Sequence, residues 1–110
     1  MSIGIDIEEI KRFSKLVKDK NFIDKIFSKE EKEYCFSKKT FVQHFAVRFA
    51  GKEAVFKALN NSKIKITDIS FRNSISGKPE VYIKNKKRKN IEVSFSHSKT
   101  TVVAVAIYNI

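Results

Sequence analysis

The stretch RFAGKEAVFKA (residues 48–58) lies within a segment, residues 41–59, whose apolar side chains recur at the spacing of an α-helix. At about 100° per residue, these side chains cover more than half of the helix circumference. Four charged residues stand among them: Arg48, Lys52, Glu53 and Lys57. The sequence therefore predicts a long central helix that is largely buried and nevertheless carries charges.

Two of these charges, Lys52 and Glu53, fall inside the apolar arc and not on a separate polar face. Burying an isolated carboxylate is costly, so Glu53 needs a cation, a metal ion or a wet cleft. An internal salt bridge with Lys57, four residues further on, meets this need as well as a functional site does. Lys52 can extend its ammonium group past the apolar side chains to water. The helix alone leaves these interpretations open.

Shorter patterns on both sides of the long helix predict an α+β fold. An alternating pattern of Ile3, Ile5 and Ile7 with polar residues predicts an N-terminal strand. Further helices are predicted over residues 10–17, over residues 22–27, and from the capping-box sequence SKEE (28–31) to about residue 36. Strands are predicted over residues 66–73, after a turn at 77–79, over 91–97 and over 101–108, with a basic loop at 84–90. We expect a single domain, residues 1–110, with several helices followed by a mainly antiparallel sheet.

The charge balance restricts the partners. There are 23 Lys and Arg residues against 12 Asp and Glu residues, which gives a net charge of +11. Such a surface attracts nucleic acid, phosphate-rich small molecules or an acidic protein. No apolar run approaches the roughly 20 residues of a membrane span, so no membrane association is expected. A single cysteine, Cys35, excludes an intrachain disulfide and fits a reduced, cytoplasmic setting.

Asp6 and His97 are further candidates for a functional site. Asp6 ends an apolar strand before a helix, where it either caps that helix or joins Glu53 in holding Mg²⁺. His97 closes a strand face formed by apolar residues, where it is either a hydrogen-bonded core histidine or a ligand contact. His44 lies on the side of the long helix away from Glu53, and the sequence gives it no role.

Four separated stretches together resemble one family: GIDIEEI (4–10), RFAGKEAVFKAL (48–59), SGKPEV (76–81) and VSFSHSKTTVVAVAI (93–107). In this order, they resemble holo-[acyl-carrier-protein] synthase, the small type of 4′-phosphopantetheinyl transferase, over nearly the whole chain. The resemblance implies the 4′-phosphopantetheinyl transferase fold. It also implies Mg²⁺-dependent transfer of 4′-phosphopantetheine from coenzyme A to a serine of apo acyl carrier protein, for fatty acid biosynthesis. Adenosine 3′,5′-bisphosphate is the other product.

The matched motifs imply roles for individual residues. Asp6 and Glu53 match the Mg²⁺ ligands, and Glu53, directly or through a metal-held water, is implied to help deprotonate the carrier serine. Lys57 matches a catalytic lysine that contacts the coenzyme A pyrophosphate. The other implied coenzyme contacts are Arg48, Lys52, His97, the group Gly77, Lys78 and Pro79 beside the adenine, and Lys39 with Lys38 at the 3′-phosphate.

The resemblance also implies protein partners. Arg12 matches an arginine that docks the acidic acyl carrier protein, with Lys11, Lys15 and Lys18 as helpers. An ordinary solvated face is the less favoured alternative for these lysines. The family is a homotrimer with its active sites at the subunit interfaces. We therefore expect a cytoplasmic homotrimer.

The competing interpretation is a basic α+β nucleic-acid-binding module. The net charge and the run KNKKRKN (84–90) favour it. However, no candidate strand carries the paired exposed aromatic residues on which sheet-type RNA binders stack bases. It also leaves Asp6 and Glu53 unexplained, so nucleic acid is not an expected partner.

Overall fold

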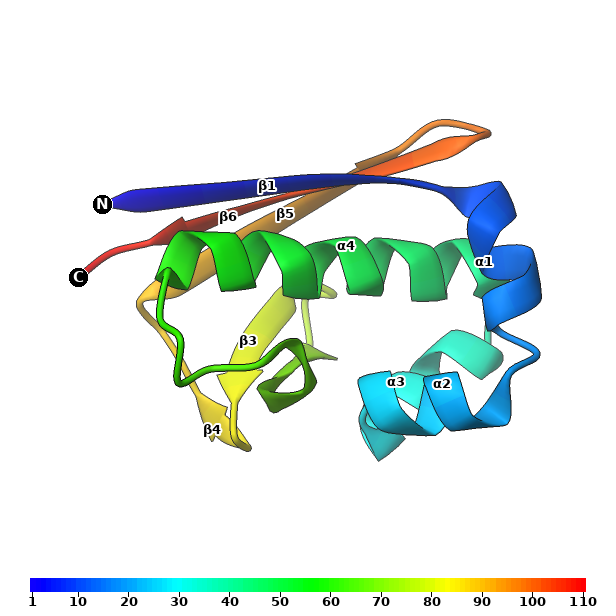
Figure 1. Cartoon of the computed structure of the whole chain (residues 1–110), viewed down its shortest axis with the longest axis horizontal. Helices are drawn as coiled ribbons and strands as arrows, with labels where there is room; N and C mark the ends of the chain where they lie inside the picture. Colours follow the sequence, from blue (N-terminus) through cyan, green and yellow to red (C-terminus); the bar gives the residue numbers. More distant parts are fainter.

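Helix α4 (Phe41–Leu59) lies across one face of a three-stranded antiparallel sheet in the computed structural model, which describes residues 1–110 (Figure 1). This sheet has the strand order β1 (Ser2–Glu9), β6 (Thr101–Tyr108) and β5 (Ile91–His97). Three short helices connect β1 to α4: α1 (Ile10–Leu16), α2 (Lys20–Ile26) and α3 (Lys29–Phe36). The predicted α+β class, with a strand, several helices and then antiparallel strands, is confirmed.

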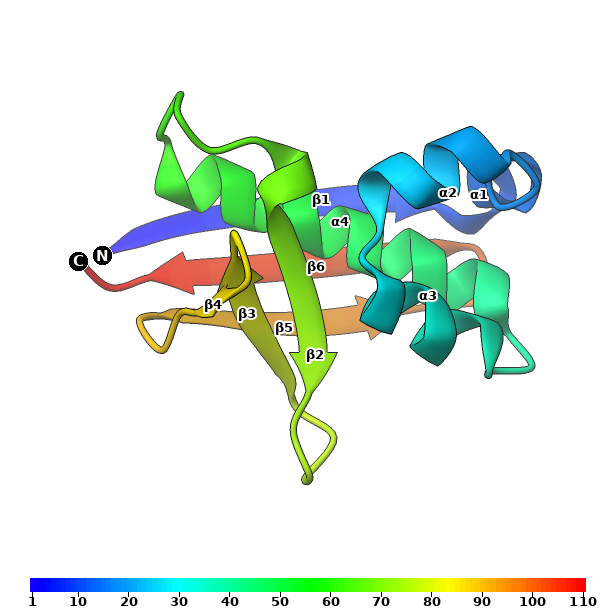
Figure 2. The same cartoon turned by 90° about the horizontal axis from the view of Figure 1, so that it is seen from below.

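A second antiparallel sheet packs against α4 and β5, and its strands run steeply across the first sheet (Figure 2). It has the strand order β2 (Ile69–Asn73), β3 (Pro79–Ile83) and β4 (Lys86–Lys87). Gly51 of α4 faces this sheet, and a Cβ atom there would press on the rings of Phe71 and Phe95. A glycine inside the helix thus has a packing reason, although it costs about 1 kcal/mol of helix propensity.

Strand β1 passes unusually close to α4. A Cβ atom at Gly4 would collide with the backbone of Ala54, so only glycine permits this approach. Asp6 follows two residues later on the same side of β1, opposite Ala104 of β6. The close approach therefore brings the side chain of Asp6 toward α4.

The predicted helix signals are confirmed in detail. Ser28 and Glu31 form the predicted capping box at the start of α3. Helix α4 ends at Leu59, and Asn60 closes it in the left-handed conformation that asparagine tolerates. One strand prediction and one loop prediction need correction. The segment 66–68 is a short 3-10 turn, η1 (Ile66–Asp68), before β2, and the predicted loop at 84–90 contains the short strand β4.

The core contains aromatic residues from the short helices and from α4. The rings of Phe27 and Phe45 lie 4.9 Å apart, and those of Phe13 and Phe49 lie 5.3 Å apart. These contacts attach α1 and the α2–α3 junction to α4. None of the helices is both long and apolar enough to cross a lipid bilayer.

The isoleucines of β1 point away from this core. Ile3, Ile5 and Ile7 are 63%, 59% and 65% exposed. The alternation predicted from the sequence is therefore correct as a strand pattern, but it is the polar side of the strand that faces α4. The outer side of β1 is an apolar surface in the single chain.

Candidate functional site

Strand β1 and helix α4 bring together an acidic half-site formed by Asp6, Glu53 and Lys57. The Lys57 ammonium lies 3.5 Å from Asp6 Oδ1 and donates a hydrogen bond of 2.9 Å to the carbonyl of Ile5. Glu53 forms no ion pair, so the internal salt bridge with Lys57 that the sequence allowed is absent. Partial burial, followed by the nearby charge of Asp6, raises the pKa of Glu53 above its ordinary value.

This half-site suits a divalent cation. The Asp6 side chain is 13% exposed, and its Oδ2 is buried without a hydrogen-bond partner. A carboxylate oxygen in this state needs a positive charge or a donor. No cluster of three or more metal-ligating side chains is present. A cation at Asp6 and Glu53 would therefore complete its shell with water and substrate oxygens, which is the usual situation for Mg²⁺.

Glu8 adjoins the acidic half-site, and it was not among the site residues predicted from the sequence. It shares the inward side of β1 with Asp6, and its Oε1 accepts a hydrogen bond of 2.6 Å from Arg12. Burial, and then the adjacent Asp6 carboxylate, raise the pKa of Glu8 to about 7. The alternation along β1 was the signal that placed Asp6 and Glu8 on one side.

The predicted docking residues lie on α1 and just after it. Arg12 is 56% exposed, although it bridges to Glu8 and lies 5.5 Å from the ring of Phe13. The three predicted helpers are exposed: Lys11, Lys15 and Lys18. The surface is thus open to an acidic partner.

A second half-site is a groove of about 190 Å³ on another part of the molecule. Four of the predicted coenzyme contacts line it: Arg48, Gly77, Pro79 and His97. Tyr34, His44 and Asn73 line it as well, and none of the three was predicted as a site residue. Their positions follow from the packing of α3, α4 and β2, which no local sequence signal shows.

Arg48 is the central residue of this groove. It is 4% exposed, and it donates a hydrogen bond of 2.9 Å to Asn73 Oδ1. Its guanidinium carbon lies 4.2 Å from the centre of the Tyr34 ring. Its Nε is buried and has no acceptor. A buried guanidinium with an unused donor suits an anionic ligand.

The two half-sites lie on opposite sides of α4. Lys57 follows Arg48 by nine residues, which at about 100° per residue places the two side chains half a turn apart. Neither Asp6 nor Glu53 lines the groove. A single chain therefore does not unite all the predicted site residues in one cavity.

For Lys52 the sequence left two alternatives, a contact with coenzyme A or an ammonium group extended to water, and its burial fits neither of them. Its side chain is fully buried, and its ammonium lies 2.7 Å from Glu31 Oε1 and donates to the carbonyl of Ile69. Glu31 Oε2 accepts a hydrogen bond of 2.9 Å from the backbone of Phe71. Burial lowers the pKa of Lys52, and the Glu31 charge counteracts this. Lys52 therefore neither contacts a ligand nor reaches water.

Two other predicted coenzyme contacts lie at the surface. Lys78 pairs with Glu92 at 3.3 Å and does not line the groove, whereas its neighbours Gly77 and Pro79 do. Lys39 is exposed in the turn before α4. The ammonium of the preceding Lys38 lies 4.9 Å from the centre of the ring of Tyr34, which lines the groove.

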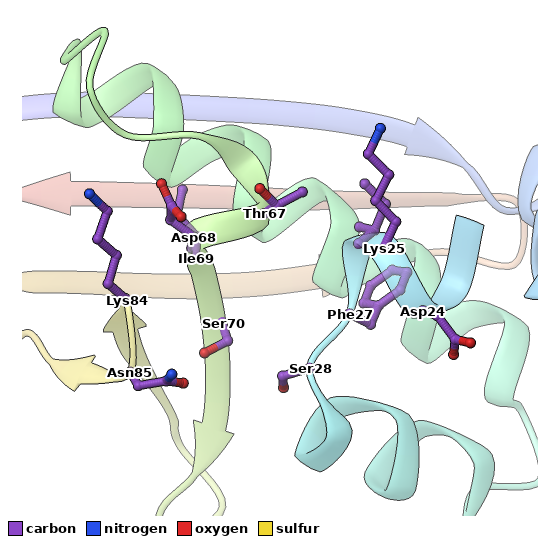
Figure 3. A pocket seen from close by; sticks show the side chains of 11 residues that line it. Asp24, Lys25, Phe27, Ser28, Thr67, Asp68, Ile69, Ser70, Lys84 and Asn85 are labelled. Atoms are coloured by element: carbon purple, nitrogen blue, oxygen red, sulfur yellow. The ribbon is translucent and has the colours of Figure 1, made fainter. Parts of the chain in front are cut away.

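A larger hollow, of about 440 Å³, contains none of the predicted residues. It lies between the α2–α3 junction and the segment from η1 to β2. Figure 3 shows its two lysines, Lys84 and Lys25, on opposite sides of the hollow. Because its charged groups do not converge, we assign it no role.

Comparisons with known proteins agree with the motifs. Residues 2–107 match the 4′-phosphopantetheinyl transferase superfamily. The chain is 39% identical to a holo-[acyl-carrier-protein] synthase of Treponema denticola, over 97% of this chain and 96% of that protein. It is 41% identical to one of Chlamydia caviae, over 96% and 93% of the two chains.

Solved structures give the same result for the fold. A holo-(acyl-carrier-protein) synthase of Bacillus anthracis, in complex with CoA (3′,5′-ADP), superposes with a TM-score of 0.82 at 31% identity, over 97% of this chain and 94% of that one. The Helicobacter pylori enzyme, in complex with coenzyme A, superposes with a TM-score of 0.83 at 28% identity, over 97% and 99%. The chain therefore belongs to the 4′-phosphopantetheinyl transferase superfamily and, within it, to the holo-[acyl-carrier-protein] synthases.

Proposed function

We propose that this enzyme transfers 4′-phosphopantetheine from coenzyme A to a serine of apo acyl carrier protein and releases adenosine 3′,5′-bisphosphate. Family membership gives the reaction. The observation that carries the assignment to residues is the acidic half-site. There a buried, unpartnered oxygen of Asp6 lies beside Glu53 and Lys57. The basic surface also suits both an acidic carrier protein and a phosphate-rich coenzyme.

Asp6 and Glu53 would hold Mg²⁺, which supplies charge neutralisation at the pyrophosphate when bound. Glu53 accepts the proton of the carrier serine, because it is the carboxylate of the half-site that forms no ion pair of its own. The serine oxygen forms a bond to the β-phosphorus as the bond from that phosphorus to the bridging oxygen breaks. Lys57 donates to the phosphate oxygens that gain charge in this step.

We propose a homotrimer in which each active site combines two chains. The acidic half-site and the groove lie on opposite sides of α4, so the acidic half-site of one copy would face the groove of the next. The exposed isoleucines of β1 support an assembly, because an apolar strand face of this kind is usually covered in a stable protein.

We propose that the carrier protein docks on the exposed basic side of α1. Arg12 is the central residue, and the lysines around it act mainly through charge. Asp6 lies on the strand that leads directly into α1, and Glu8 of the same strand pairs with Arg12. A docked carrier would thus present its serine near Glu53.

A mass-shift assay tests the proposed reaction. The enzyme is mixed with coenzyme A, Mg²⁺ and several apo acyl carrier proteins, with and without a chelator, and the carrier is weighed by intact-protein mass spectrometry. We expect the carrier to gain the mass of one phosphopantetheine in the mixtures without chelator, and to keep its mass in the mixtures with chelator. Carriers that keep their mass in every mixture would exclude the proposal.

A further inference from the structure

The groove half-site gathers positive charge around one aromatic ring, that of Tyr34. The Arg48 guanidinium and the Lys38 ammonium both lie over this ring, at 4.2 Å and 4.9 Å from its centre. His44 packs edge-on against the same ring, with the ring centres 5.6 Å apart, and His97 lines the same groove. No carboxylate side chain lines the groove. Neither Lys38 nor Arg48 forms an ion pair.

The donors of this cluster are only partly used. Arg48 gives one hydrogen bond to Asn73, while its buried Nε has no acceptor. The first turn of α4, which carries His44, has no side-chain cap and no acidic residue. Its free backbone N–H groups and the helix dipole favour a negative charge. The groove is therefore built for an anion with several acceptor oxygens, such as a phosphate monoester.

The same surroundings disfavour the charged form of His44 in the free groove. Partial burial, and then the charges of Arg48, Lys38 and His97, lower the pKa of its imidazole. These groups come from α4, from the turn before it and from β5, and no acidic group opposes them. A phosphate placed among them would reverse the local sign of charge, and an adjacent anion favours the charged imidazole.

We propose that His44 contacts the phosphate on the ribose of coenzyme A, and that this bound phosphate favours the charged form of its imidazole. The inference rests on the proposed function, which brings coenzyme A to this protein. In that function the pyrophosphate belongs to the acidic half-site, so the ribose phosphate is the group left for the groove. His44 then adds a charge-assisted hydrogen bond and distinguishes coenzyme A from its 3′-dephospho form.

The charge of His44 can be followed directly, because the chain has only two histidines. The imidazole C–H signals of the assembled enzyme are titrated by NMR alone, with coenzyme A, and with 3′-dephospho-coenzyme A. His44→Gln assigns the signal. We expect His44 to titrate at a higher pH with coenzyme A than in the free enzyme, and at an unchanged pH with the dephospho form. The same midpoint in all three states, or the same rise with both ligands, would overturn the proposal.

Binding affinity gives a second measurement. At pH 6, the preference for coenzyme A over the dephospho form should fall about tenfold in His44→Gln. His44→Phe is the matched variant, because it keeps an aromatic ring against Tyr34 but cannot carry charge, and it should lose as much. A full preference in either variant contradicts the role of His44. A wild-type enzyme that fails to bind coenzyme A at all would instead count against the proposed function.

Discussion

Glu53 is partly buried, unlike an ordinary surface glutamate. Its carboxyl lies beside Asp6 and forms no ion pair of its own, which leaves both of its oxygens for a metal ion and a substrate proton. The sequence placed Glu53 correctly among apolar side chains, but left a salt bridge with Lys57 as an equal alternative. The structure removes that alternative, because Lys57 pairs with Asp6.

Glu53→Gln is expected to lower the transfer rate by at least about 10²-fold, because the amide can neither take a proton nor bind a cation strongly. Mass spectrometry of the carrier measures the rate. The control is Glu33→Gln, an exposed glutamate of α3, which should keep the wild-type rate. Full turnover by Glu53→Gln would remove Glu53 from the mechanism.

The raised pKa of Glu8 predicts that the stability of the metal-free protein depends on pH. Its pKa is raised from 4.5 to about 7 in the folded state, so the folded state binds more protons between these values. The stabilising contribution is complete below about pH 4.5 and is lost as the pH rises through about 7. Comparing the Tm of Glu8→Gln with that of the wild type, with a chelator present, should show a weaker loss between pH 5 and pH 8 for the variant.

The control for this prediction is Glu9→Gln. Glu9 is the next residue on β1 and is exposed on the other side of the strand. Its substitution should leave the wild-type pH dependence in place. The idea fails if Glu8→Gln and Glu9→Gln give the same curve.

Helix α4 is held in place by a buried ion pair that joins three elements. Lys52 of α4 meets Glu31 of α3, and the same carboxylate accepts a backbone hydrogen bond from Phe71 of β2. The pair orients α3, and Tyr34 of α3 in turn forms one wall of the groove. A residue buried in this way acts on the site only through the position of the helix.

Lys52→Met is expected to destabilise the protein by about 3–5 kcal/mol, because it leaves Glu31 buried without a cation. The double variant Lys52→Met with Glu31→Gln should recover part of this loss, since no net charge then stays in the core. Urea unfolding of the three proteins measures the difference. A Lys52→Met variant as stable as the wild type would contradict the role of the pair.

The elements themselves were largely predictable from the sequence. The capping box at Ser28, the period of α4 and the alternation over residues 91–97 depend on neighbours within a few positions, so local patterns report them. The ion pair of Lys52 with Glu31 joins residues 21 positions apart, and no local pattern reports such a contact. The same limit explains why Glu31 was seen only as a helix cap, and why Tyr34, His44 and Asn73 were missed.

At the scale of the whole molecule, the acidic half-site and the groove hold most of the predicted metal, catalytic and coenzyme residues, and a single chain keeps these two half-sites apart. The family motifs predicted which residues belong to the site but not which of the two half-sites each one joins. The order of the motifs along the chain carries no information about the side of α4 on which a side chain lies. A helical wheel of α4 already separates Arg48 from Lys57, and this was the available signal.

Subunit complementation tests the composite site. Glu53→Gln damages only the acidic half-site, and Arg48→Ala damages only the groove, so each variant alone should be inactive. Co-expressed copies should regain roughly a quarter of the wild-type activity, because random assembly pairs an intact acidic half with an intact groove at that frequency. Native mass spectrometry of the same sample reports the number of chains in each particle. Inactive mixed trimers would argue that each chain forms its site alone.

The apolar outer side of β1 has a consequence for how the protein behaves at low concentration. Ile3, Ile5 and Ile7 meet water in an isolated chain, and covering them in an assembly is favourable by the hydrophobic effect. By mass action, the folded assembly then gains stability as the chain becomes more abundant. Specific activity, the activity per chain, should therefore fall on dilution. A cell that makes half as much of this protein would then lose more than half of the enzyme activity.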